Sequence, residues 1–302
     1  PAGKLAYSTV DGKNYGVPFD NGAVIGAYRT DILEQAGYTT ADLTDIDWNR
    51  FIEIGKDVKA KTGTYMLSGQ ADSPDTIMMM LQSAGASLFD EDGKPAMTDN
   101  AALKECIDIY KTMVDEGIYL EVNKWDDYVT SITKGSVAGV INGNWIIATI
   151  QGMEDTAGKW EITNMPKLIK TPNATNYSNN GGSSWYITSN CKNKDLAIDF
   201  LKSTFAGSVE LYDKILASTG AIATYLPAGE SEKYAEPVAY WSDQPIYKTI
   251  VDYSKLTPAN NTSPYYYDGR NAIGTQIQNI MNGADTDSAI ADAQAEVEFS
   301  MQ

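Results

Sequence analysis

The 302-residue chain contains no histidine, only two cysteines and no apolar run long enough to cross a bilayer. Without histidine it lacks the commonest general base, the usual zinc ligand and any Ser-His or Cys-His nucleophile pair. A spanning helix needs about 20 consecutive apolar residues, so we expect no direct membrane span. Cys106 and Cys191 are too far apart for a metal cluster or a CxxC redox site, and Cys106 fits a buried position in a helix.

Positive charge is scarce as well. The chain has 23 basic and 40 acidic side chains, which give a formal net charge of −17. A surface with this much negative charge repels phosphate backbones and anionic lipid. We therefore expect no nucleic-acid partner. The 43% of hydrophobic and 21% of charged residues are typical of a globular chain that is large enough for more than one core.

Motifs for catalysis or for metal binding are missing too. The chain has no GxGxxG, no P-loop and no GxSxG. Residues 90–93 (DEDG) resemble the start of a calcium loop, but the later ligands are absent, so we predict a hairpin turn. Asp285 and Asp287 are predicted to cap a helix. Asp126 and Asp127 point in different directions on one helix, and a helix N-terminus explains their charge better than a glycosidase pair does. We expect no metal and no cofactor.

The periodicity alternates between strands and helices. Buried strands are predicted at 24–28, 137–141, 160–165 and 184–187, and helices at 30–37, 48–62, 73–85, 100–116, 124–134, 146–152, 194–205, 208–216, 268–281 and 287–299. Thr30 is expected to cap the first helix, Gly37 and Gly135 to end helices, and residues 142–144 to form a tight turn before Trp145. This alternation predicts an α/β fold with a largely parallel sheet.

Many aromatic residues lie beside turns. They are Trp125, Tyr128, Trp145, Trp185 and the tyrosine triplet 265–267. The C–H face of a sugar ring stacks on such side chains, while nearby carboxylates and amides bind its hydroxyls. The alternative is that these rings fill the core, which we predict for Trp48, Trp160 and Trp241 because they lie within apolar patterns.

Seven stretches then follow one another in a recognisable order. They are GKNYGVPFDNGAVIGAYRTDILEQAGY, IDWNRFIEIGKDVK, SAGASLFDEDGKPAMTD, ITKGSVAGVINGNWI, NGGSSWYITSNCKNKDLAIDFLKS, TGAIATYL and NGADTDSAIADAQAEV. Their order and spacing resemble the extracellular solute-binding proteins of ABC transporters, in the branch of maltose- and oligosaccharide-binding proteins. No single motif carries the resemblance, which spans nearly the whole chain.

The resemblance implies a type II periplasmic-binding-protein-like fold, with two α/β lobes that close on a ligand in the cleft. Residues 1–24 and 187–232 would belong to the first lobe, and 25–182 and 236–302 to the second. The family's first lobe normally begins with further units of about 100 residues, on the scale of a small domain. We therefore expect an incomplete first lobe here, exposed apolar surface on the helices at 194–205 and 208–216, and weak sugar binding by this chain alone.

The implied function is non-catalytic capture of a carbohydrate, most simply a neutral oligosaccharide, for an ABC importer. The partners would be the ligand and the importer's membrane permease subunits, and the location would be the extracellular face of the bacterial membrane, with a lipid anchor, or the periplasm. A binding protein for another small solute, such as a peptide or polyamine, is the first alternative. A glycan-active enzyme domain is the second, and it would need two carboxylates facing each other across the cleft.

The resemblance also carries ligand contacts over by position. They are Asp20, Asn21, Ser73, Asp75, Trp145, Gly182, Ser183, Ser184, Trp185, Tyr267, Asp268 and Arg270. Trp145 and Trp185 are expected to stack on the sugar, and Arg270 leaves room for an acidic sugar. Because the layout puts Cys106 and Cys191 in different lobes, we predict that both thiols are free.

Overall fold

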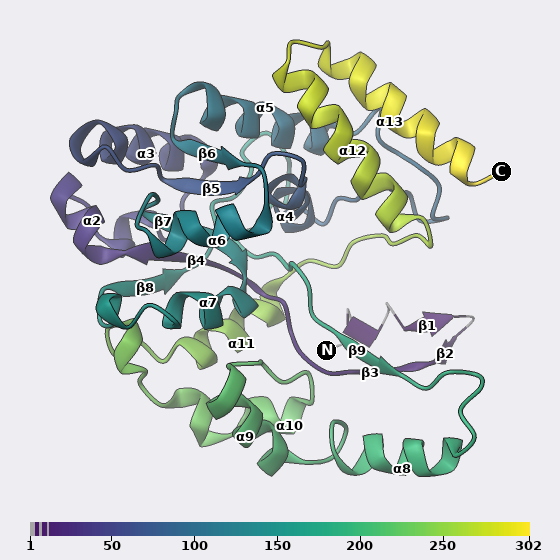
Figure 1. The fold of residues 1–302 in the computed structure, drawn as a ribbon. Coiled ribbons are helices and arrows are strands. Elements are labelled where there is room, and N and C mark those ends of the chain that lie inside the picture. Colours follow the sequence, from purple (N-terminus) through teal and green to yellow (C-terminus); the bar gives the residue numbers. More distant parts are fainter. Residues whose placement is uncertain (1–3, 6–7, 11) are drawn as a thin grey trace.

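The computed structural model describes residues 4–5, 8–10 and 12–302 (Figure 1). Its strands are β1 (Thr9–Val10), β2 (Lys13–Asn14), β3 (Gly16–Pro18), β4 (Val24–Arg29), β5 (Leu67–Gln70), β6 (Tyr119–Val122), β7 (Gly139–Gly143), β8 (Trp160–Thr163) and β9 (Ser184–Tyr186). Its α-helices are α2 (Thr30–Ala36), α3 (Trp48–Thr62), α4 (Asp75–Ser83), α5 (Ala101–Asp115), α6 (Trp125–Thr133), α7 (Ile147–Gln151), α8 (Lys194–Ser203), α9 (Val209–Thr219), α10 (Leu226–Gly229), α11 (Ile246–Leu256), α12 (Tyr266–Met281) and α13 (Thr286–Ser300).

The central sheet is mixed rather than largely parallel. Strand β4 lies between β7 and β8 and runs antiparallel to both, with Ala27 opposite Val140 on one side and Ile162 on the other. Strands β5 and β6 pair in parallel, and the Ala138 amide donates to Tyr65 O, which joins β5 to β7. The predicted parallel sheet is therefore wrong for β4. A helical crossover makes two consecutive strands parallel only where they are also neighbours in the sheet, and the neighbours of β4 are β7 and β8.

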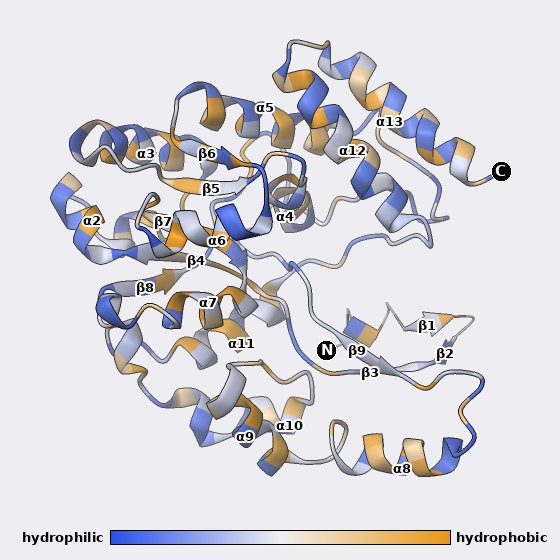
Figure 2. Ribbon diagram, viewed as in Figure 1, coloured by the Kyte–Doolittle hydropathy of each residue, from blue (hydrophilic) through white to orange (hydrophobic). Residues whose placement is uncertain are grey.

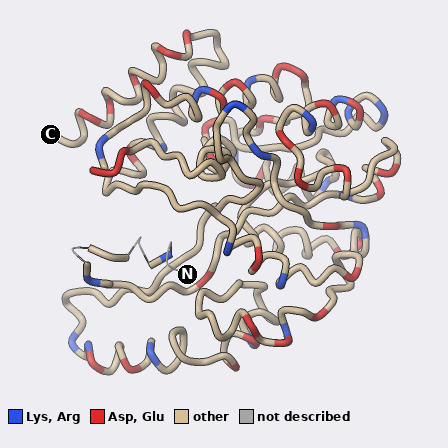
Figure 3. Tube along the Cα trace, turned by 180° about the vertical axis from the view of Figure 1, so that it is seen from behind, with Lys and Arg blue, Asp and Glu red and all other residues tan. Residues whose placement is uncertain are grey.

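Strand β4 is buried on both faces. Val24 and Tyr28 belong to a large core cluster with α3, α4, α5, α12 and α13, whereas Ala23, Ile25 and Ala27 belong to a second cluster with α7, α9 and α11. This alternation follows from the period of two in a strand. Hydrophobic residues therefore line β4 in Figure 2, and the charges in Figure 3 lie mainly on the outer helices and loops.

The three tryptophans predicted for the core are in it. Trp48 and Trp160 are each 1% exposed and Trp241 is fully buried. Helix α3 begins at Trp48 after Asp47, whose carboxylate accepts from the Arg50 amide, so its predicted bounds are confirmed. The other predicted helices are all present, with ends that differ by a few residues.

Several local predictions can be judged individually. Gly37 and Gly135 adopt positive φ at helix ends, as predicted, and Asp285 caps α13 by accepting from the Ser288 amide. Thr30 is not a cap, because it lies inside α2 and the capping position belongs to Arg29. The predicted turn at 142–144 is also wrong.

Strand β7 continues through Gly143, whose φ is −56°. The residue is glycine because a Cβ atom there would overlap Asn180 O and the Trp145 indole. Close approach of another chain segment, rather than a positive φ, therefore explains this glycine.

Two segments, which contain β3 and β9, connect the central sheet and the helices packed on it to the N-terminal residues. We call them the crossing segments, and we call the central sheet with its packed helices the sheet body. Strands β3 and β9 pair antiparallel beside the central sheet, with α8 below them in Figure 1. Helix α8 has no buried residue, and Leu196 and Phe200 are 69% and 56% exposed. Helix α9, in contrast, buries Tyr212 and Leu216, so the expected exposure of both helices is found only for α8.

Candidate functional site

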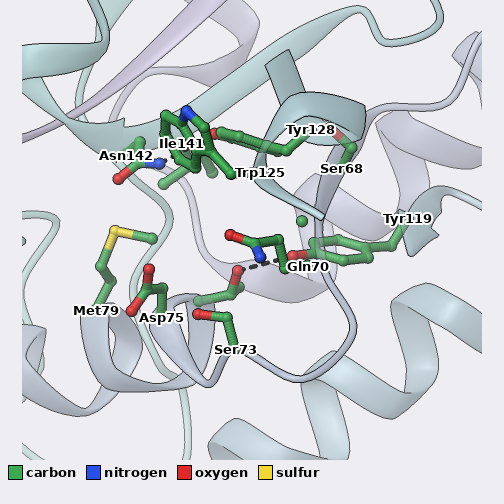
Figure 4. Close-up of a pocket in the computed structure, with 12 residues that line it drawn as sticks. Ser68, Gln70, Ser73, Asp75, Met79, Tyr119, Trp125, Tyr128, Ile141 and Asn142 are labelled. Carbon is green, nitrogen blue, oxygen red and sulfur yellow. Dashed lines mark hydrogen bonds between the residues drawn. The ribbon is translucent and has the colours of Figure 1, made fainter. Parts of the chain in front are cut away.

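A pocket opens between the first turns of α4 and α6, beside the ends of β5 and β7. It holds about 340 Å³ of empty space, part of which is open to solvent. Its lining, shown in Figure 4, consists of Ser68, Gly69, Gln70, Ser73, Asp75, Thr76, Met79, Tyr119, Trp125, Tyr128, Ile141 and Asn142. Aromatic rings of α6 face polar side chains of α4 across this space (Figure 4).

The aromatic wall is built by one helical turn. Trp125 and Tyr128 are three residues apart on α6, so they lie on the same face, with ring centroids 5.2 Å apart. Trp125 remains 44% exposed and Tyr128 is buried. Burial raises the pKa of Tyr128 to about 12, so its hydroxyl stays neutral at physiological pH. This hydroxyl accepts a hydrogen bond from Asn142 Nδ2 at 3.0 Å.

The polar wall comes from the end of β5 and the start of α4. Here Arg270 of α12 donates to Asp75 at 2.6 Å and to Ser73 Oγ at 3.2 Å. The Thr76 and Tyr119 hydroxyls share a hydrogen bond of 2.9 Å, and a Cβ atom at Gly69 would overlap the Tyr119 hydroxyl. Because Arg270 balances the carboxylate of Asp75, this wall offers hydroxyl and amide groups with little net charge.

The structure brings three of the predicted site residues together, namely Ser73, Asp75 and Arg270. Trp145 lies outside the lining, next to the aromatic wall. Its ring centroid is 5.8 Å from that of Trp125, it is 36% exposed, and its Nε1 donates to Asn180 O at 2.9 Å. The indole that reaches the pocket is therefore Trp125, with Trp145 packed beside it.

Five other predicted residues lie in the crossing segments. The Asp20 carboxylate accepts from the Ser183 amide, and Asn21 Oδ1 accepts from the Ala23 amide at 3.0 Å. Gly182 has a φ of +84°, and Ser184 pairs with Pro18 in the β3–β9 ribbon. These residues shape the connection between the sheet and the N-terminal part of the chain rather than the pocket lining.

The last three predicted residues lie apart from the pocket lining. Trp185 packs on Phe19 and Phe205 at centroid distances of 5.6 and 5.1 Å. Tyr267 is 71% exposed and Asp268 is exposed in the first turn of α12. Ligand contacts by these residues and by the crossing segments stay predictions.

Sequence reasoning missed most of the lining. It noted Trp125 and Tyr128 as aromatic residues near turns, Ile141 as the end of a strand and Asn142 as part of a turn, but it placed none of them in the site. It did not single out Ser68, Gly69, Gln70, Thr76, Met79 or Tyr119. One signal was available for Asn142, a polar residue directly after the predicted buried strand at 137–141, because ligands of α/β proteins commonly bind at strand ends.

Within the described ranges, no group of three or more acidic or cysteine side chains could hold a metal ion. None of the helices described here has the length and apolar character needed to cross a membrane. Cys106 is buried in α5, Cys191 is half-buried, and both thiols are free.

Comparison with known proteins gives consistent relatives. A family model described as "Bacterial extracellular solute-binding protein" matches residues 1–243. The lactose-binding protein of Rhizobium radiobacter is 38% identical over 287 residues, which cover 95% of this chain and 68% of that protein. An arabinooligosaccharide-binding protein of Halalkalibacterium halodurans is 24% identical, over 97% of this chain and 67% of its own length.

A solved structure has the same fold. It is the ABC transporter associated binding protein of B. animalis subsp. lactis Bl-04, in complex with beta-1,6-galactobiose. The TM-score is 0.80 at 20% identity, and the match covers 100% of this chain and 75% of that one.

Proposed function

Since the chain belongs to the bacterial extracellular solute-binding proteins and has a periplasmic-binding-protein-like fold, we propose that it captures a neutral di- or oligosaccharide for an ABC importer. It is a binding protein and not an enzyme. As a member of an extracellular family, it works at the outer face of the bacterial membrane or in the periplasm. Its partners in this proposal are the sugar and the membrane permease subunits of the importer.

The observation that carries the proposal is the pairing of an aromatic wall with a polar wall. Trp125 offers an exposed ring, and Gln70, Ser73 and Asn142 offer amide and hydroxyl groups within the same pocket. A pyranose has an apolar C–H face and a rim of hydroxyls, so it can stack on the ring while its hydroxyls bond to the amides. A polyamine lacks this combination of surfaces.

The charge of the pocket favours a neutral ligand. Among the twelve lining residues, Asp75 is the one ionisable carboxylate, and Arg270 pairs with it. A polyamine would need unpaired carboxylates, and a glycosidase would need a second carboxylate facing the first. An acidic sugar would compete with Asp75 for Arg270. The paired charge therefore supports a neutral sugar over all three alternatives.

In this proposal a longer saccharide extends from the pocket along Trp145 and the crossing segments. The names of the relatives, which mention lactose, arabinooligosaccharide and beta-1,6-galactobiose, supply the sugars to try first.

The lobe boundary in this proposal lies at the paired crossing segments β3 and β9. Residues 25–182 and 236–302 form one lobe, and residues 1–24 and part of 187–232 belong to the other. Helix α9 buries Tyr212 and Leu216 in the cluster that contains Ile25 and Ile162. This burial supports counting residues 209–232 with the lobe formed by residues 25–182 and 236–302.

Calorimetry of the intact protein tests the function directly. The panel is lactose, beta-1,6-galactobiose, arabinooligosaccharides and maltooligosaccharides, with oligogalacturonate and spermidine as charged comparisons. We expect micromolar or tighter binding of at least one neutral sugar, which chromatography then recovers unchanged. Binding of spermidine or oligogalacturonate in preference to every neutral sugar would overturn the proposal, and so would hydrolysis of the bound sugar.

A further inference from the structure

Asn180 is tied to the pocket wall by both its backbone and its side chain. Its carbonyl accepts from Trp145 Nε1 at 2.9 Å, and its Nδ2 donates to Asn142 Oδ1 at 2.8 Å. Its backbone amide donates to Gly22 O at 2.8 Å, which joins it to the first crossing segment. Asn180 is therefore held from two sides at the point where the chain leaves the sheet body.

The two residues that follow Asn180 have unusual backbone conformations. Gly181 and Gly182 adopt φ angles of +98° and +84°, a region that glycine occupies at little cost. Beyond them, Ser183 donates to the carboxylate of Asp20 and β9 begins. The hydrogen bonds to the pocket wall thus end at Asn180, directly before the two glycines with positive φ.

Both ties begin at groups that form or support the pocket. Asn142 lines the pocket and is 6% exposed, and its Nδ2 donates to the Tyr128 hydroxyl. Trp145 packs against Trp125, which supplies the exposed ring of the aromatic wall. Asn142 therefore bonds directly to Asn180, whereas one residue, Trp145, lies between Trp125 and Asn180.

The packing around these ties leaves little room for alternatives. A Cβ atom at Gly143 would overlap Asn180 O, and one at Gly181 would lie 3.1 Å from Trp145 Nε1. Asn142 Oδ1 also accepts from the Gly143 amide at 2.8 Å, so the asparagine side chain is held on both sides. A ligand that presses on Trp125 or bonds to Asn142 will act on groups that have one well-defined arrangement.

We propose that Trp145 and Asn142 couple occupancy of the pocket to the conformation of residues 180–182, so that bound sugar restrains the connection between the sheet body and the β3–β9 ribbon. This inference rests on the proposed function, because the restraint depends on a sugar in the pocket. Trp145 acts here as a positioning residue through its N–H group, in addition to its packing against Trp125.

Hydrogen–deuterium exchange of the intact protein tests the coupling in the peptide that covers residues 178–184. The measurement is made without ligand and with the panel sugar that binds best. Trp145→Phe removes the N–H donor and keeps an aromatic ring, and Asn180→Ala removes the tie to Asn142. In either variant we expect exchange without ligand to rise about fivefold, the loss of one typical hydrogen bond. The slowing caused by sugar in the wild type should be lost.

Trp125→Phe is the matched control. It changes an indole that contacts Trp145 through its ring and keeps an aromatic side chain in the pocket. We expect weaker sugar binding but wild-type exchange of residues 178–184 in the ligand-free variant. A folded Trp145→Phe variant with wild-type exchange, or with the full sugar-induced slowing, would overturn the coupling while leaving sugar binding intact. Failure of every panel sugar to bind the wild type would instead overturn the proposed function, and the coupling with it.

Discussion

Arg270 donates a hydrogen bond to Asp75 at 2.6 Å, which joins α12 to the first turn of α4 although the two residues are 195 positions apart. The same guanidinium donates to Ser73, so one side chain fixes both polar residues at the start of α4. The pair is half-buried, with 25% and 39% of the two side chains exposed. It balances the charge of Asp75, the one carboxylate among the lining residues.

Breaking this pair should change ligand preference. In Arg270→Met, Asp75 keeps its charge without a partner, so we expect weaker binding of neutral sugar, measurable binding of spermidine, and a stability loss of about 1 kcal/mol after allowance for solvent exposure. Calorimetry and denaturant unfolding measure these effects.

Adding Asp75→Asn to Arg270→Met should abolish the spermidine binding, because the unpaired charge is gone. Arg50→Met is the matched control, since the pair of Arg50 with Glu53 is exposed and distant in sequence from the pocket lining. Spermidine binding by the Arg50 variant, or none by Arg270→Met, would contradict the role assigned to the pair.

The tryptophans should differ in their contribution to binding. Trp125→Ala and Trp145→Ala should each weaken sugar binding by about 1–3 kcal/mol, the scale for loss of a buried aromatic contact. Trp185→Ala tests whether Trp185 contacts the ligand, as the sequence predicts, or only packs in the protein. If Trp185 contacts the ligand, the variant should lose a similar amount of binding free energy. If it only packs on Phe19 and Phe205, the variant should be less stable with little change in affinity. Titration and melting of the same three variants decide between them.

Gly139 should not tolerate a side chain. A Cβ atom there would overlap the ring of Tyr28, which is fully buried and cannot move away. We expect Gly139→Ala to lower the free energy of unfolding by about 1–3 kcal/mol, the range for overpacked cores. Gly229→Ala is the control, because its Cβ atom would meet Val251 at an ordinary distance of 3.7 Å. Equal stability of the two variants in urea would show that β4 and β7 can separate more easily than their packing indicates.

The two thiols should react at very different rates. Burial raises the pKa of the Cys106 thiol well above its ordinary value, so little thiolate forms and reagents cannot reach it. Cys191 is half-buried and should react with a thiol reagent in the native protein, with Cys106 reacting only after denaturation. Intact mass should not change by two hydrogens on reduction, and such a change would reveal a disulfide.

Local features of this fold were predictable because their causes are local. The bounds of α3 follow from three local signals: Asp47 at its N-terminal cap, the spacing of the buried residues Trp48, Phe51 and Val58, and Gly63 at its C-terminal cap. The pocket was less predictable, because Gln70, Trp125 and Asn142 meet only after β5 has joined β7. Gly143 shows the same limit, since the neighbour that requires a glycine comes from a segment 37 residues later, at Asn180.

The position of β4 has a consequence for how the molecule unfolds. Val24 and Tyr28 support one core cluster while Ile25 and Ala27 support the other, so neither cluster can be lost without exposing the opposite face of the same strand. The free energies of the two clusters are thereby linked, and the sheet body should melt in a single cooperative transition rather than in two. The amides of β4 should accordingly be the last to exchange, because they open only when the whole body does.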